Sequence, residues 1–298
     1  MPYMYLAKVN LSSKIFDVYE NKLSIAKVLN VVYRDMNDKN TYTYTQTKKF
    51  TDSLGNIKEY QKKSRYQFNE LMKNDENMTI TGKIVRTYSR PIEEFNDDGE
   101  IINSYEDAHV SIYFFFDVRK ELVAFSMRQS FGYNQFIEAF KKLLNLCISE
   151  YDFEVFLKKD QNVLSEKLKA LKTVNRVSAT LIPPNSNEEE LKEFRETLGY
   201  ISECKETNAK KIKLDLIDTD DVGLNMEAKM MRDTIKAAVK GYGDITTYGV
   251  NFNGREEVVK SNTDAALTRV INENLSESDY NDEAASFMAA VIATSLAH

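Results

Sequence analysis

Histidine and cysteine are scarce in this chain of 298 residues, which contains two of each. A zinc site built from histidine and cysteine is therefore excluded by number. Because His298 is terminal, a Ser-His-Asp or Cys-His mechanism would have to use His109, and no catalytic signature accompanies it. Cys147 and Cys204 both fall in apolar helical patterns, which predicts buried free thiols in a reducing compartment.

Nucleotide-binding signatures and membrane signatures are also missing. The sequence has neither a Gly-x-x-x-x-Gly-Lys-Ser/Thr loop nor a Rossmann glycine triplet, which disfavours a nucleotide motor or a dehydrogenase. Residues 1–10 do not have the pattern of a signal peptide, and the longest apolar segment, residues 284–297, is too short to span a bilayer. We therefore expect a cytoplasmic protein with no membrane contact and no cofactor.

Apart from these absences, the amino-acid composition is that of an acidic globular protein. The hydrophobic fraction of 42% is sufficient for a sizeable core. The net charge of -6 argues against a surface that binds nucleic acid everywhere, but it leaves room for a local basic face. The length suits one large domain or two moderate ones.

Strand and helix patterns alternate from Arg176 onwards. Residues 211–217 alternate between polar and apolar as a half-buried strand does, and Gly241 is suited to end the helix expected at 224–240. Further strands are expected at 176–182, 245–250 and 257–260, with another helix from about residue 188. The pattern predicts an α+β fold in which a mixed sheet carries helices on one face.

The rest of the chain extends this prediction. Strands are expected at 3–11, 78–88, 110–116, 122–127 and 153–157, and helices at 15–36, 136–148, 164–171, 265–272 and 283–296. We divide the chain into a β-rich portion (1–107), an α/β core (108–260), and an acidic segment with a C-terminal helix (261–298).

A basic and aromatic region lies between Tyr42 and Arg90. It holds ten basic and five acidic residues, a local charge of +5 in an acidic protein. Basic side chains interleaved with tyrosines on strands are typical of surfaces that bind single-stranded nucleic acid. A solvated hairpin whose tyrosines cover the edge of a core would give the same pattern. The candidate binding residues are Lys48, Lys49, Tyr60, Lys62, Lys63, Arg65, Tyr66 and Arg86.

Two acidic stretches are candidates for cation binding. Residues 92–107 contain seven carboxylates and no lysine or arginine, which predicts a solvated surface loop; a bound divalent cation is the alternative. Asp215, Asp218 and Asp220 follow a predicted strand, where metal-dependent nucleases often place the carboxylates that hold Mg²⁺. Helix capping explains the same aspartates without any chemistry.

The predicted C-terminal helix carries an apolar stripe formed by Phe287, Met288, Val291 and Ile292. Such a stripe either docks on the protein's own core or pairs with a second copy of the chain, and the sequence leaves both open.

Several short motifs resemble a bacterial family of unknown function that is often found among phage-defence genes. The resemblance covers roughly residues 110–260. It rests on Phe115-Phe116-Asp117, Ala124-Phe125, the run Val177–Asn185, the strand Lys211–Ile217 and Gly241-Tyr242-Gly243. The family has no established catalytic residues, so none is carried over. The resemblance implies an accessory or effector role in antiviral defence, as a subunit of a complex.

These observations favour a non-enzymatic component of a defence system that binds nucleic acid or a partner protein. A Mg²⁺-dependent nuclease that uses Asp215, Asp218 or Asp220 is the first alternative. A structural subunit that assembles through the C-terminal helix is the second.

Overall fold

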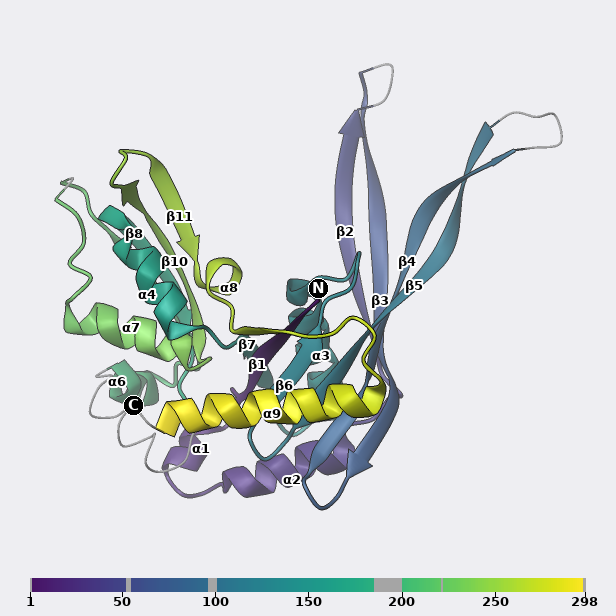
Figure 1. Ribbon diagram of the computed structural model, residues 1–298, viewed down its shortest axis with the longest axis horizontal. Coiled ribbons are helices and arrows are strands. Elements are labelled where there is room, and N and C mark those ends of the chain that lie inside the picture. Colours follow the sequence, from purple (N-terminus) through teal and green to yellow (C-terminus); the bar gives the residue numbers. More distant parts are fainter. Residues whose placement is uncertain (1, 52–54, 96–100, 185–199, 221, 297–298) are drawn as a thin grey trace.

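Two antiparallel sheets form the framework of the computed structural model, which describes residues 2–51, 55–95, 101–184, 200–220 and 222–296 (Figure 1). Strands and helices are combined as the α+β prediction requires. The sheets are not mixed, however, because every strand pairing in the described chain is antiparallel.

The larger sheet has eight strands in the order β12-β1-β6-β5-β4-β3-β2, and β7 also pairs with β1. Seven of its strands lie between residues 3 and 157, and the eighth, β12, returns from near the C-terminus. The bounds are β1 Tyr3–Leu11, β2 Thr41–Thr51, β3 Ile57–Asn74, β4 Thr79–Phe95, β5 Ile101–Asp117, β6 Leu122–Ser126, β7 Phe153–Leu157 and β12 Thr268–Val270.

The smaller sheet has four strands in the order β11-β10-β8-β9. Its strands are β8 Leu171–Leu181, β9 Ile212–Ile217, β10 Gly243–Asn251 and β11 Glu256–Lys260. Gly254, which has a φ of 74°, lies in the turn of the β10–β11 hairpin. The two sheets do not divide the chain at residue 107, because β5 runs through that position.

Eight helices are described: α1 Ile15–Tyr19, α2 Ile25–Asp35, α3 Tyr133–Cys147, α4 Gln161–Lys169, α6 Tyr200–Thr207, α7 Lys229–Val239, α8 Ser261–Asp264 and α9 Glu277–Leu296. Gly241 follows α7 with a φ of 89°, as predicted for the residue that ends this helix. The beginning of the helix expected from residue 188 lies outside the described residues.

Helix α3 fills the inner face of the larger sheet. Its apolar residues recur at spacings of three and four, so one stripe of the helix is buried. Phe136 stacks on Phe125 of β6, and Phe140 lies edge-on to Phe114 and Phe116 of β5. The same buried cluster continues into β8, β10 and α7, so the two sheets share one core.

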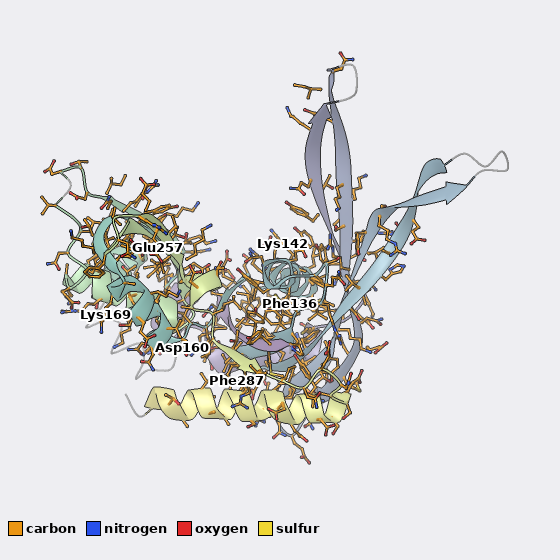
Figure 2. The ribbon with its side chains drawn as sticks, turned by 45° about the horizontal axis from the view of Figure 1, so that its top comes forward. Phe136, Lys142, Asp160, Lys169, Glu257 and Phe287 are labelled. Atoms are coloured by element: carbon orange, nitrogen blue, oxygen red, sulfur yellow. The ribbon has the colours of Figure 1, made fainter. Side chains whose placement is uncertain are left out.

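Helix α9 covers the opposite, outer face of the larger sheet (Figures 1 and 2). Met4, Leu6 and Phe115 point to this face, because neighbours along a strand alternate between faces. Phe287 and Met288 of α9 pack against them. The larger sheet therefore has helices on both faces, and the consecutive Phe114-Phe115-Phe116 marks a strand that is buried on both faces.

Two local predictions were wrong. Residues 92–95 and 101–107 belong to β4 and β5 and form a hairpin, so they are not a loop. The helix expected at 265–272 is replaced by β12, which pairs with β1; the short α8 ends just before this range. Within the described residues, no helix combines the length and the apolar character that crossing a membrane requires.

Candidate nucleic-acid interface

Two long β-hairpins project from one end of the larger sheet (Figure 1). One is formed by β2 and β3, the other by β4 and β5. β3 and β4 pair from Asn74↔Thr79 as far as Ser64↔Tyr88, and beyond that pair the two hairpins separate. Each hairpin then continues as a free two-stranded ribbon. We call residues 45–63 the basic arm and residues 89–107 the acidic arm.

The arms carry opposite charges. The basic arm contains five lysines and two acidic residues, which gives +3. The acidic arm contains seven carboxylates and one arginine, which gives -6. At the base of the arms Arg65 forms an ion pair with Asp107 at 3.2 Å. Both side chains are more than half exposed, so this contact contributes little to stability.

The register of β2 and β3 sorts the basic arm into two faces. Thr43 pairs with Arg65, Thr45 with Lys63 and Thr47 with Gln61, so these six side chains share one face. We call this the threonine face; all six side chains are exposed. The opposite face carries Tyr44, Gln46 and Lys62.

The candidate binding residues separate accordingly. Lys49, Lys63 and Arg65 are exposed on the threonine face, and Lys62 is half-buried on the opposite face. Lys49 forms an ion pair with Glu59 across the arm at 2.9 Å. Lys48 and Tyr60 are paired in the register, but their side chains lie outside the described residues. In the described structure Lys62 and Lys63 form no ion pair, so their charges remain available to an external anion.

Tyr66 and Arg86 lie inside the protein, at the base of the arms. Tyr66 is 3% exposed and packs against Phe131 and Tyr42. Arg86 is 6% exposed; it donates hydrogen bonds to the Ser64 hydroxyl and to the Ser130 carbonyl, and it lies over the ring of Tyr88. These two candidates hold the arms on the sheet and are not accessible to a ligand.

Residues that the sequence prediction missed complete the site. Thr43, Thr45, Thr47 and Gln61 lie among the candidate cations on the threonine face. The available signal was threonine at every second position from 41 to 47. At the base of the same face a hollow of about 230 Å³ is lined by Thr41, Arg65, Tyr66, Gln67, Val85 and Thr87.

The aspartates near the end of β9 do not converge on a common point. Asp215 accepts two hydrogen bonds of 2.7 Å from Arg176, and these bonds lower the pKa of its carboxyl. Asp218 accepts hydrogen bonds from the backbone N–H groups of Asp220 and Gly223, as a turn-capping residue does. No group of three or more potential metal ligands occurs among the described histidines, cysteines and acids.

A family model matches residues 24–288, a range that includes both arms, the smaller sheet and every strand of the larger sheet except β1. The chain belongs to the DUF4747 family. The family is described as a domain of unknown function. No curated protein matches the chain. The match covers most of this DUF4747 protein and assigns no activity.

The apolar stripe of α9 is used within the DUF4747 chain. Phe287 is 4% exposed and Met288 is fully buried, while Val291 and Ile292 are half-buried against the same cluster. Of the two roles that the sequence left open for this stripe, docking on the core is confirmed.

Replacing Met288 with alanine should therefore lower the free energy of unfolding by about 2 kcal/mol or more, because it leaves a cavity under α9. Met230→Ala on α7, where the side chain is 46% exposed, is the matched control and should have little effect. Urea denaturation measures both. A Met288→Ala protein with unchanged stability but a lower mass in light scattering would show instead that α9 joins two copies.

Proposed function

We propose that this DUF4747 protein binds nucleic acid through its basic arm, as a non-enzymatic component of a bacterial antiviral defence system. One observation carries the proposal: lysines without an ion-pair partner in the described structure stand on a projecting basic ribbon of an otherwise acidic protein. Lysine is a common ligand of phosphate. The phosphate backbone of a nucleic acid releases counterions when lysines bind it.

Removing two of these lysines should weaken binding in a salt-dependent manner. For the double variant Lys62→Ala/Lys63→Ala we expect a salt slope smaller by about 2 and an affinity about tenfold lower at low salt, because each phosphate contact contributes about 1 to the slope. Fluorescence anisotropy with labelled DNA and RNA at several salt concentrations measures both quantities. The control Lys167→Ala/Lys169→Ala removes the same charge from α4, away from the arms, and should leave binding unchanged.

Three results would contradict the proposal. Absence of binding at low salt by the wild-type chain would reject nucleic acid as the ligand and favour a protein partner. Equal losses in both double variants would mean that total charge, not the basic arm, determines binding. Mg²⁺-dependent cleavage in the same tubes, lost in Asp218→Ala, would support the nuclease alternative.

A role in antiviral defence is supported by the resemblance to a family found among phage-defence genes. In bacteria that carry the gene in its native neighbourhood, we expect fewer phage plaques than in bacteria without it, and Lys62→Ala/Lys63→Ala should restore plating. Equal plaque numbers with and without the wild-type gene, across several phages, would count against this role.

A further inference from the structure

The threonine face of the basic arm carries hydrogen-bonding groups that are not used inside the protein. The side chains of Thr43, Thr45, Thr47, Gln61 and Lys63 are exposed, and in the described chain none of them makes a side-chain hydrogen bond or ion pair. Threonine hydroxyls donate and accept, the glutamine amide does both, and lysine donates. This mixture of groups can form hydrogen bonds with the donors and acceptors on the edges of nucleic-acid bases.

The arm has the dimensions of an element that fits a DNA groove. Two paired strands lie about 4.8 Å apart, and with side chains a ribbon is roughly 10 Å wide. The register continues from Thr43↔Arg65 to Thr51↔Ile57, which corresponds to a length of about 26 Å at 3.3 Å per residue. The major groove of B-form DNA is about 12 Å wide and admits a two-stranded ribbon.

We infer that the preferred ligand of the basic arm is duplex DNA in the B form, with the threonine face turned toward the floor of the major groove. This inference rests on the proposed function and specifies its substrate class. Thr45, Thr47 and Gln61 lie in the half of the arm nearest the sheet and face the base edges. Lys63 reaches phosphate oxygens at the groove wall.

The tyrosines of β2 and β3 whose side chains are described offer little support for a single-stranded ligand. A stacking surface for single strands needs exposed aromatic rings in succession. Tyr66 is buried, and Tyr42 is half-buried with its ring stacked on Tyr66 at 5.8 Å. Among Tyr42, Tyr44 and Tyr66, which lie on the paired strands β2 and β3, only Tyr44 is exposed, at 46%.

The acidic arm restricts the direction from which DNA can approach. In the sheet order β2 lies at the edge, and β4 and β5 lie on the other side of β3. The acidic arm therefore stands on the β3 side of the basic arm, where its charge of -6 repels phosphates. The β2 edge remains as the approach with the least repulsion, and from it DNA can reach the part of the threonine face beyond Arg65, which holds Asp107 of the acidic arm at 3.2 Å.

The inference is tested with the full chain and four probes of one sequence: duplex DNA, duplex RNA, single-stranded DNA and single-stranded RNA. We expect duplex DNA to bind at least tenfold more tightly than duplex RNA, because the major groove of A-form RNA is too narrow and deep for side chains to read. Methylation of guanine N7, which blocks the major groove, should weaken binding to duplex DNA. A drug that occupies the minor groove should not.

A pair of glutamines on opposite faces provides matched variants. Gln61 belongs to the threonine face and Gln46 to the opposite face, and both are exposed. Gln61→Leu should lower the affinity for duplex DNA about tenfold, as expected for the loss of one good base contact, while leaving the salt slope unchanged. Gln46→Leu should bind like the wild type.

The outcomes separate this inference from the proposed function. If single strands or duplex RNA bind as tightly as duplex DNA, the protein still binds nucleic acid, but the inference that the basic arm enters the major groove of duplex DNA is rejected. Equal effects of Gln61→Leu and Gln46→Leu would show that the threonine face does not contact the bases. If none of the four probes binds, the proposed function fails together with the inference.

Discussion

Replacing Phe140 with alanine is expected to lower the free energy of unfolding by about 3–5 kcal/mol, the largest loss of stability that we expect from a single truncation in this protein. Phe140 is fully buried in α3, and its ring lies 5.4–5.7 Å from those of Phe114, Phe116, Phe68 and Phe136. Its removal would open a cavity between α3 and the strands from which both arms project.

The control is Phe252→Ala, which deletes the same side chain where it is 71% exposed, just after β10. Urea denaturation followed by circular dichroism should show a lower midpoint for Phe140→Ala and little change for Phe252→Ala. If the two variants were equally stable, the rings around Phe140 could not be the centre of the core. Residual binding by folded Phe140→Ala protein would show that the arms act independently of this packing.

Elements whose pattern repeats locally could be predicted from the sequence. The strict alternation of residues 211–216 reports the half-buried side of β9, and the apolar stripe of residues 136–148 reports the buried side of α3. The acidic arm could not be recognised in this way. Residues 92–107 carry seven carboxylates and lack the regular alternation that marks a half-buried strand. These charges predicted a loop, whereas the backbone pairs as a hairpin.

The binding candidates show a second limit of the sequence. Interleaved tyrosines and basic residues indicate a strand surface, but they do not show where the core ends along it. Tyr66 pairs with Arg86 across β3 and β4, over the part of the sheet that α3 covers. Lys62 is only four residues before Tyr66, yet it lies outside the part of the sheet that α3 covers. The distinction depends on the position of α3, which is set by contacts far apart in the sequence.

β12 shows the same limit. Its three residues exist as a strand because they pair with β1 at the other end of the chain. Local propensity favoured a helix at 265–272, and tertiary pairing overrode it. The α9 helix was predictable from its own stripe, but the outer face on which it docks is assembled from β1, β5 and β6.

Lys159→Met is expected to cost about 3 kcal/mol, because it removes the buried cation of an ion pair whose carboxylate, on Asp244, is one-third exposed. Lys159 follows β7 of the larger sheet and is 2% exposed. Its ammonium group donates hydrogen bonds to the Gly243 carbonyl at 2.7 Å and to the Asp244 carboxylate at 2.6 Å, at the start of β10 in the smaller sheet. The variant leaves both acceptors without this donor where the two sheets meet.

The pH dependence of stability provides an independent measurement. Burial lowers the pKa of Lys159, although Asp244 acts in the opposite direction. Between that lowered pKa and the unfolded value of about 10.4, the unfolded chain holds a proton that the folded chain has released. The contribution of Lys159 to the free energy of unfolding therefore rises with pH across this window. Lys159→Met should lack this rise, whereas the exposed control Lys169→Met should retain it.

The double variant Lys159→Met/Asp244→Leu decides whether the cost comes from the unpaired carboxylate. Replacing both partners removes the uncompensated charge, so the double variant should be more stable than Lys159→Met alone. If it is less stable by the full sum of the two single losses, the two side chains act separately. DNA binding by the folded variants should equal that of the wild type, because this junction between the sheets lies outside both arms. A loss of binding would instead mean that the smaller sheet also contacts the ligand.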